Sequence, residues 1–224
     1  MLEPWLKTHL LVNEVFHSIQ GEGYWAGTPA IFIRLQGCTV GCPWCDTGYA
    51  LGLRVEDRLS DNDLLVFCKT DISSAFTLAQ ETWLVQEVLA RRGLLQHVVL
   101  TGGEPCAQPI MDLTRDLLQA GMQVQIETSG TCPIECAYGT WVTLSPKAKP
   151  VMEANWSKAD EIKLPVRTME DVQRHAGHLA SLPAERIRLQ PVNQESAATA
   201  LCVRLCMERN WRLSLQTHKY INLR

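Results

Sequence analysis

The sequence has no long apolar run and no concentrated stripe of basic residues. No stretch approaches the roughly 18 apolar residues that a membrane-spanning helix requires. The formal net charge is −3 at pH 7 and the sequence pI is about 6.1, so the broad positive surface that attracts nucleic acid is missing. We therefore expect a protein that neither enters a membrane nor binds DNA or RNA directly.

Internal repeats, low-complexity tracts and the pattern of a secretory leader are also missing. The first residues carry no basic segment that leads into an apolar core. With 224 residues, 46% of them hydrophobic, the chain is long enough to bury one substantial core. We expect a single domain over residues 1–224 and a cytoplasmic location.

Cysteine is the residue that the chain has in unusual number, with nine copies. The number is odd and no secretion signal accompanies it, so a reducing compartment explains it better than a disulfide framework. Cys202 and Cys206 lie about one turn apart in a run of helical periodicity, which favours small buried hydrophobes. Cys132 and Cys136 flank a proline, and no third ligand is near them in the sequence, which argues against a second metal site. No role is assigned to Cys68 and Cys106.

Three other cysteines fall within eight residues. Cys38, Cys42 and Cys45 form a C-x3-C-x2-C run on a loop, where three thiolates can face one point in space. A cubane iron–sulfur cluster has four irons, and the usual protein complement is four cysteines, so three cysteines leave one iron open. An open position on a metal centre is typical of chemistry rather than of structural support. The run therefore predicts a reactive 4Fe–4S cluster.

Short apolar runs rich in Val and Ile alternate with segments of helical periodicity. This pattern predicts an α/β fold in which helices cover a mainly parallel sheet. Six parallel strands are fewer than the eight of a closed barrel, which suggests an open, partial barrel. The predicted strands are residues 30–35, 97–101, 123–127, 141–145, 161–164, 186–190 and 212–216. The predicted helices are residues 77–91, 109–121, 168–180 and 194–209.

Polar motifs occur at or just after the carboxyl ends of five predicted strands. The loops that follow parallel strands converge, and ligand sites in α/β folds gather there. The motifs are residues 38–45, 102–104, 128–130, 145–147 and 190–191. Residues 48–74 interrupt the alternation and are interpreted as an insertion between the cluster loop and the next helix.

The segment Thr101-Gly102-Gly103-Glu104-Pro105 is the strongest of these motifs after the cysteine loop. Paired glycines let the backbone approach a ligand closely, with free N–H and C=O groups to present. A Gly-Gly turn without a ligand is the alternative. The segment lies one strand after the three clustered cysteines, however, and this position favours a functional role. Ser145 offers a hydroxyl after another strand, and Lys147 is either a site cation or a solvated surface charge.

The cysteine run resembles the signature of the radical S-adenosylmethionine (SAM) enzymes. In that superfamily the open iron chelates SAM, and an electron from the cluster splits SAM to give a radical that abstracts hydrogen from a substrate. The resemblance implies a partial (β/α)6 barrel, a 4Fe–4S cluster held by the three cysteines, and bound SAM. The SAM contacts that it implies are Gly102, Gly103, Glu104, Ser145, Pro146, Lys147 and Gln190.

A longer set of motifs is similar to the 7-carboxy-7-deazaguanine synthases of the queuosine pathway. It begins with Asn-Glu-Val-Phe-His-Ser-Ile-Gln-Gly-Glu-Gly at residues 13–23 and continues through residues 27–35, 45–47, 127–130 and 211–219. The resemblance thus covers nearly the whole chain. It implies a lyase that contracts the ring of 6-carboxy-5,6,7,8-tetrahydropterin to 7-carboxy-7-deazaguanine and expels ammonia.

The residue types of the implied substrate pocket suit a carboxylated pterin. Arg34 offers a bidentate fork for a carboxylate, with a structural ion pair as the alternative. Residues 20–22 can match the donors and acceptors of the pterin edge, and His218 is otherwise an ordinary surface histidine. The residues assigned to substrate binding are Ile19, Gln20, Gly21, Glu22, Arg34, Thr101 and His218.

The family resemblance also implies a metal ion and partners. Thr47 corresponds to a threonine that ligates magnesium in the deazaguanine synthases, so Mg²⁺ is implied, whereas Asp46 is interpreted as a turn or cap residue. A homodimer and an electron donor like flavodoxin or ferredoxin are implied as well. Some members have a far longer gap between the first two cysteines, so the substrate assignment depends on residues 20–22, Arg34 and residues 145–147.

Two other functions stay open from the sequence. Another radical SAM enzyme, such as an activase that places a radical on a partner protein's glycine, has the same cysteine spacing. A carboxylate-binding arginine favours a small-molecule substrate instead. The non-enzymatic alternative is a module in which three cysteines and a histidine hold zinc; a brown protein that absorbs near roughly 400 nm would exclude it.

Overall fold

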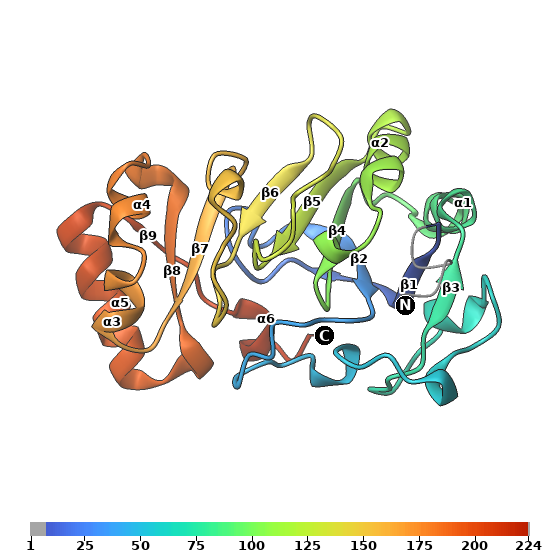
Figure 1. The fold of residues 1–224 in the computed structure, drawn as a ribbon, viewed down its shortest axis with the longest axis horizontal. Coiled ribbons are helices and arrows are strands. Elements are labelled where there is room, and N and C mark those ends of the chain that lie inside the picture. Colours follow the sequence, from blue (N-terminus) through green and yellow to red (C-terminus); the bar gives the residue numbers. More distant parts are fainter. Residues whose placement is uncertain (1–7, 224) are drawn as a thin grey trace.

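The computed structural model describes residues 8–223, in which a single nine-stranded sheet runs through the molecule (Figure 1). Its order is β3-β1-β2-β4-β5-β6-β7-β8-β9. Neighbours from β2 to β9 are parallel, and β1 is antiparallel to both β2 and β3. The strands are β1 (Leu10–Ile19), β2 (Pro29–Leu35), β3 (Thr77–Ala79), β4 (His97–Gly102), β5 (Gln123–Thr128), β6 (Trp141–Leu144), β7 (Glu161–Val166), β8 (Ile187–Pro191) and β9 (Arg212–Leu213).

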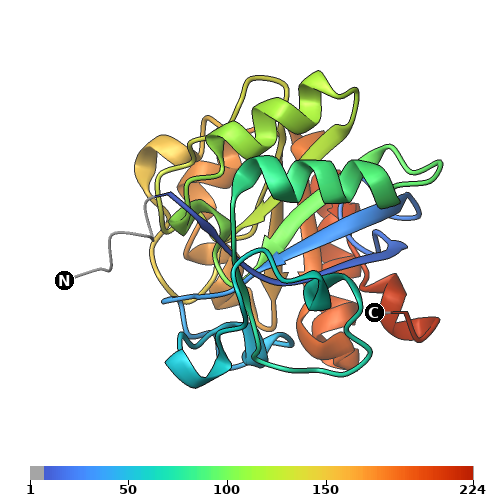
Figure 2. The same cartoon turned by 90° about the vertical axis from the view of Figure 1, so that its right-hand side faces the viewer.

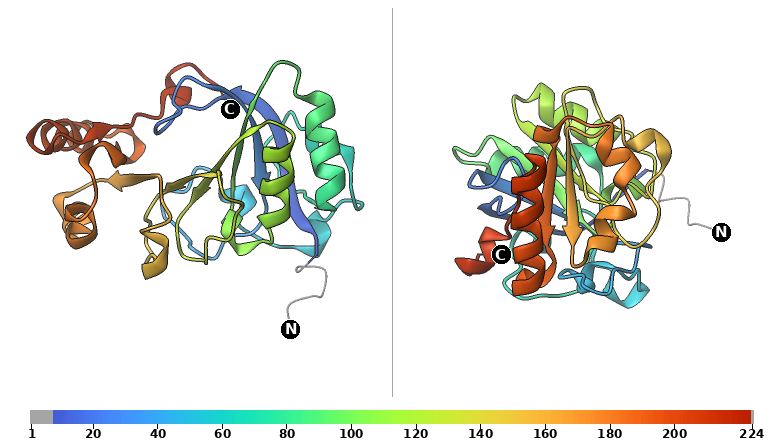
Figure 3. Two further views of the ribbon diagram at one scale, coloured as in Figure 1. Left: turned by 90° about the horizontal axis from the view of Figure 1, so that it is seen from above. Right: turned by 90° about the vertical axis from the view of Figure 1, so that its left-hand side faces the viewer.

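Helices connect most of the parallel strands. They are α1 (Glu81–Arg91), α2 (Met111–Gln119), α3 (Met169–Gln173), α4 (Ala176–Ala180), α5 (Ser196–Arg209) and α6 (Thr217–Tyr220). α1 and α2 lie side by side (Figure 2), α3 contacts β7, and α5 contacts β8 and β9. Seen from above, the sheet curves without closing (Figure 3), as expected for a partial barrel. Over residues 8–223, no helix combines the length and apolar character needed to cross a bilayer.

The helix boundaries differ from the sequence-based prediction by two residues at both ends of α2 and at the start of α5, and by more in two other places. The helix predicted from residue 77 begins only at Glu81, because residues 77–79 form β3 and pair with β1. The helix predicted over 168–180 is divided into α3 and α4. The capping box that was predicted at its start is present, with Thr168 and Asp171 as its two members.

β1 is the main element that the sequence analysis did not predict, and β9 is shorter than expected. The apolar run of β1 contains Asn13 and Glu14, two residues that are depleted in or unfavourable to strands. Both are buried, so their polar groups must find partners inside the protein. They do so through side chains of β2 and of the residue that follows it, Gln36.

The parallel strands have one apolar face and one polar face. In β5, Val124 and Ile126 belong to the hydrophobic core, whereas Gln125 and Glu127 project to the other face, as expected from the two-residue period of a strand. Lys163 in β7 also projects there. The inside of this open barrel therefore carries charged and amide side chains instead of the branched aliphatic layers of a closed barrel.

Two buried amide side chains hold the ends of the segment 48–74. Gln36 Nε2 donates to the carbonyl of Gly52 at 2.6 Å, and Asn13 Nδ2 donates to the carbonyl of Ser73 at 3.0 Å. Asn13 Nδ2 also donates to Gln36 Oε1 at 2.7 Å. The insertion is therefore fixed near both of its ends, to β1 and to the residue that follows β2.

Replacing Asn13 by alanine should lower the free energy of unfolding by about 3 kcal/mol, because several buried partners lose their hydrogen bond at once. Urea denaturation of the purified protein measures this change. His17→Ala, an exposed position on the same strand, is the control and should change stability by less than about 0.5 kcal/mol. Equal stability of the two variants would contradict the role assigned to Asn13.

Candidate active site

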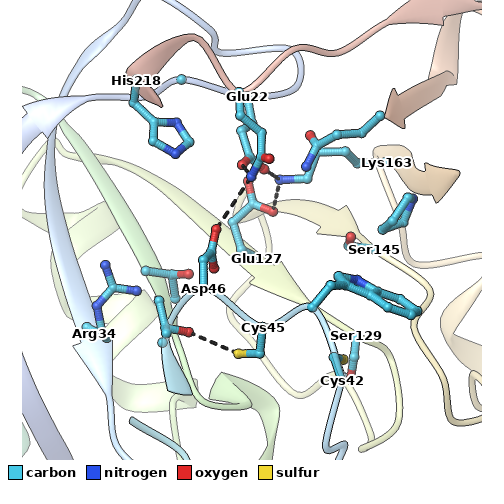
Figure 4. Close-up of a pocket in the computed structure, with 18 of the residues that line it drawn as sticks. Glu22, Arg34, Cys42, Cys45, Asp46, Glu127, Ser129, Ser145, Lys163 and His218 are labelled. Carbon is cyan, nitrogen blue, oxygen red and sulfur yellow. Dashed lines mark hydrogen bonds and ion pairs between the residues drawn. The ribbon is translucent and has the colours of Figure 1, made fainter. Parts of the chain in front are cut away.

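A cavity of about 430 Å³ opens at the carboxyl ends of the parallel strands. It is walled by the cysteine loop, by the ends of β4, β5, β6 and β8, by the loop after β1, and by the segment from residue 216 onward (Figure 4). Every residue that the sequence analysis assigned to the site lines this cavity except Pro146, which is buried and does not line it. The structure thus brings together residues from all of these segments.

The three loop cysteines all line the cavity and are half-exposed. Cys38 Sγ accepts a hydrogen bond from the N–H of Val40 at 3.4 Å, and Cys45 Sγ lies 3.5 Å from Thr47 Oγ1. Burial raises the pKa of the Cys38 thiol, and the Glu104 carboxylate adds to the effect. Within residues 8–223, no three His, Cys, Asp or Glu side chains have the mutual geometry of a metal site. The donor set is nonetheless that of an iron–sulfur cluster, whose protein ligands are thiolates.

The paired glycines after β4 are needed for packing between two loops. Gly102 has φ +114°, and a Cβ at either Gly102 or Gly103 would overlap the backbone of Leu35 or Gly37. The N–H of Gly103 donates to the carbonyl of Leu35 at 2.8 Å, and the N–H of Glu104 donates to that of Gly37 at 2.9 Å. The expectation of a free N–H group is therefore wrong for Gly103, whereas the expectation that the glycine carbonyls are presented to a ligand stays a prediction.

The Glu104 carboxylate is bound within the protein. It is buried and accepts hydrogen bonds from Thr128 Oγ1 at 2.6 Å, from the N–H of Ser129 at 2.9 Å and from the N–H of Cys106 at 3.1 Å. Ser129 Oγ donates to it as well. Glu104 therefore ties the loop after β4 to the loop after β5.

Two residues of the segment 145–147 present polar groups to the cavity. Ser145 Oγ is buried, and among the described residues it has no hydrogen-bond partner, so a ligand that bonds it would satisfy an otherwise costly group. Lys147 lines the cavity, and burial lowers its pKa. The alternative of a solvated surface charge does not describe this lysine.

A single buried ammonium faces two carboxylates on the polar side of the sheet (Figure 4). Lys163 Nζ lies 2.5 Å from Glu22 Oε2 and 2.6 Å from Glu127 Oε2. Burial raises the pKa of Glu127 to about 7, and the negative charges of Glu22 and Glu161 contribute to the rise. Burial also acts to raise the pKa of Glu22, but Lys163 and a hydrogen bond from Gln216 outweigh it and lower that pKa to about 2. Lys163 thus keeps the Glu22 carboxylate ionised at neutral pH.

The raised pKa of Glu127 predicts a dependence of stability on pH. Its folded value near 7 lies above the ordinary 4.5, so folding favours the protonated form. The resulting stabilisation is complete below about pH 4.5 and is lost as the pH rises through about 7. Relative to Glu127→Gln, the wild type should lose about 3 kcal/mol between pH 5 and pH 8. Urea denaturation of both proteins at both pH values measures this loss. The same change in the free energy of unfolding with pH in both proteins would contradict the prediction.

The loop after β1 meets a segment that lies far away in the sequence. The N–H of Thr217 donates to the carbonyl of Gly21 at 2.9 Å, and Gln216 Nε2 donates to Glu22 Oε1 at 2.8 Å. A Cβ at Gly21 would overlap the His218 ring. His218 is half-buried, and burial lowers its pKa, so it faces the cavity as a neutral imidazole at neutral pH.

Arg34 combines the two interpretations that the sequence left open. Its Nε lies 2.7 Å from Glu14 Oε1 in an ion pair, and the residue also lines the cavity. Thr101, next to it across the β2–β4 pairing, lines the cavity too. An internal ion pair and a ligand-facing guanidinium are therefore compatible in this arrangement.

Several cavity residues were not assigned by the sequence analysis. Lys163 carried a signal, since a charged residue inside a buried apolar strand must find a partner. Glu127 lay in a recognised motif without being given a role. Gln216 gave no signal of its own, because its partner Glu22 lies far away in the sequence. Tyr49 gave none, because it lies in an irregular segment. The unassigned cavity residues include Trp44, Tyr49, Glu127, Lys163 and Gln216.

Five of the six remaining cysteines form two groups, and the sixth, Cys68, is exposed. Cys202 is buried in the core and Cys206 packs against it from α5, as predicted for small hydrophobes. The folded chain brings Cys106 close enough to Cys132 and Cys136 for their charges to interact, and burial is the main cause that raises the pKa of Cys106 to about 12. The sequence did not predict that Cys106 lies near Cys132 and Cys136. Among the described residues, these three thiols do not form a metal site.

The chain is similar over almost its whole length to curated bacterial enzymes. It is 44% identical over 224 residues to 7-carboxy-7-deazaguanine synthase of Escherichia coli (strain K12), which covers 95% of this chain and 98% of that one. It is 40% identical over 217 residues to the protein of the same name from Buchnera aphidicola subsp. Schizaphis graminum, again with 95% and 98% coverage.

A solved structure agrees with the sequence matches. The crystal structure of QueE from Escherichia coli superposes with a TM-score of 0.84 and 41% sequence identity, covering 94% of this chain and 95% of that chain. A scan against models of protein families found no match.

Proposed function

Since this chain belongs to the 7-carboxy-7-deazaguanine synthase family, we propose that it converts 6-carboxy-5,6,7,8-tetrahydropterin into 7-carboxy-7-deazaguanine with loss of ammonia, in queuosine biosynthesis. The observation that carries the proposal is the meeting of Arg34, Glu22 and the three-cysteine loop in one cavity. A carboxylate-binding cation and an ionised acceptor suit the two ends of a carboxylated pterin.

The cofactors proposed for this cavity are a 4Fe–4S cluster, SAM and Mg²⁺. Cys38, Cys42 and Cys45 would hold the cluster, the unpartnered hydroxyl of Ser145 suits a polar group of SAM, and Thr47 offers one oxygen to a metal that needs few protein ligands. When bound, the reduced cluster and SAM together supply hydrogen abstraction from the substrate. The family membership supports this set.

The protein's own groups then bind and orient the substrate. Glu22, held ionised by Lys163, accepts hydrogen bonds from the guanidine-like edge of the pterin. Arg34 receives the carboxylate, and neutral His218 can donate or accept at the cavity wall.

The test is an anaerobic incubation of the reconstituted protein with SAM, a reductant, Mg²⁺ and carboxytetrahydropterin, followed by mass analysis. Formation of 7-carboxy-7-deazaguanine is the expected result. Deoxyadenosine formed from SAM only when a partner protein is added would instead favour an activase, and a colourless protein that holds zinc would favour a structural module. Either result would overturn the proposal.

We also propose a cytoplasmic homodimer that receives its electron from a flavodoxin-like or ferredoxin-like protein. The family resemblance supports both partners, and the open sheet edges at β3 and β9 suit association between copies. Sedimentation of the cluster-loaded protein tests the dimer, and the rate of cluster reduction by each donor class tests the electron source.

A further inference from the structure

Arg34 is held from behind by a buried carboxylate on the neighbouring strand. Glu14 of β1 and Arg34 of β2 are register partners in the antiparallel pair. The side chain of Glu14 is 1% exposed and that of Arg34 is 11% exposed. Glu14 Oε1 accepts from Arg34 Nε at 2.7 Å, which uses the inner edge of the guanidinium. Among the described residues, the two terminal nitrogens of Arg34 have no acceptor in the protein.

The same oxygen of Glu14 is held by a second group. Tyr49 Oη donates to Glu14 Oε1 at 2.9 Å, and Tyr49 belongs to the short 3₁₀ turn Gly48–Ala50 that directly follows the cysteine loop. Through Glu14, the segment that carries Thr47 is therefore tied to the arginine. Glu14 itself does not line the cavity, whereas Arg34 and Tyr49 do.

Two aromatic rings restrict the remaining freedom of the guanidinium. Its Cζ lies 5.5 Å from the ring centre of Phe16 and 5.7 Å from that of Tyr49, both within the range of cation–π contact. Phe16 in turn stacks on Phe32 with 5.2 Å between ring centres. An arginine fixed at Nε and flanked by rings can turn only its terminal nitrogens toward a ligand, which is the geometry of a bidentate carboxylate contact.

We propose that Glu14 is a positioning residue that aims the terminal nitrogens of Arg34 at the substrate carboxylate, and that Tyr49 fixes Glu14 for this task. The inference rests on the proposed function, because it requires a carboxylated substrate. Glu14 touches neither substrate nor cofactor. Its effect is on selectivity, since without it the guanidinium can rotate away and the carboxylate loses its paired hydrogen bonds.

The test compares two ligands on the cluster-loaded, SAM-bound protein by anaerobic equilibrium dialysis. One ligand is carboxytetrahydropterin and the other is the same tetrahydropterin without the carboxylate. Glu14→Gln should weaken binding of the carboxylated ligand by about 10-fold, the effect of one charge-assisted hydrogen bond. Binding of the ligand without the carboxylate should change by less than about 2-fold, because its contacts do not involve Arg34.

Tyr49→Phe keeps the ring and removes only the hydroxyl, so it tests the proposal even if Glu14→Gln folds poorly. It should weaken binding of the carboxylated ligand by about 3-fold and leave binding of the other ligand unchanged, as expected for one neutral hydrogen bond. The matched control is Tyr138→Phe, which removes a hydroxyl from a fully exposed ring outside the cavity. It should leave the dissociation constants of both ligands unchanged.

If Glu14→Gln or Tyr49→Phe weakens binding of both ligands equally, the role is merely structural and the inference is overturned. Unchanged binding of both ligands would overturn it as well. Failure of the proposed function is distinguishable, because it appears in the wild type, as absence of product from carboxytetrahydropterin. Iron content and melting temperature of each variant show whether the cluster and the fold are retained.

Discussion

Replacing Cys42 by alanine is expected to leave no detectable formation of 7-carboxy-7-deazaguanine and to lower iron content after reconstitution. The proposed cluster, which has three protein ligands instead of four, would then have only two, and the iron that stays open for the proposed SAM would no longer be unique. Cys42 lines the cavity and is half-exposed, so the substitution removes a ligand without opening a hole in the core.

Cys68→Ala is the matched control. Cys68 is exposed and lies outside the cavity, so this variant should keep its brown colour, its iron content and full turnover. Iron analysis, the visible spectrum and mass analysis of the product measure the three properties. Normal iron content and turnover in Cys42→Ala would contradict the assignment of the cysteine loop to the cluster.

Replacing Lys163 by methionine is expected to lower the free energy of unfolding by about 3–5 kcal/mol, because two buried carboxylates lose the cation that they share. Turnover should also be lost, since the ionised state of Glu22 depends on this ammonium. Urea denaturation and the product assay measure the two effects. Retention of wild-type stability would contradict the proposed charge balance.

A second substitution separates charge from packing. In Lys163→Met combined with Glu127→Gln, one unpaired carboxylate is removed, so the loss of stability should be smaller than in Lys163→Met alone. Lys158→Met is the control, because Lys158 is exposed and its ammonium donates to a single backbone carbonyl, that of Ile134. Lys158→Met should lower the free energy of unfolding by less than about 1 kcal/mol.

The family and the α/β architecture were predictable because they depend on local patterns. Three cysteines within eight residues and Val/Ile-rich runs that alternate with helical periodicity are visible over short windows. The relatives and the solved structure confirm the predicted family, fold class and enzymatic function. The individual roles of the site residues remain predictions.

The features that were missed depend on contacts between distant residues. The paired glycines were predicted to offer free N–H groups, but the N–H of Gly103 bonds the carbonyl of Leu35, and the N–H of the next residue, Glu104, bonds that of Gly37, which local sequence cannot indicate. β1 was not predicted because Asn13 and Glu14 look unsuitable for a buried strand until Gln36 and Arg34 are known to be their partners.

The contact between Thr217 and Gly21 has a consequence for the order in which the protein matures. These residues are 196 positions apart in the chain, so the cysteine loop is synthesised long before the segment that forms the far wall of the cavity. A chain that ends before Thr217 therefore carries the three loop cysteines but lacks the contact that closes this side of the cavity.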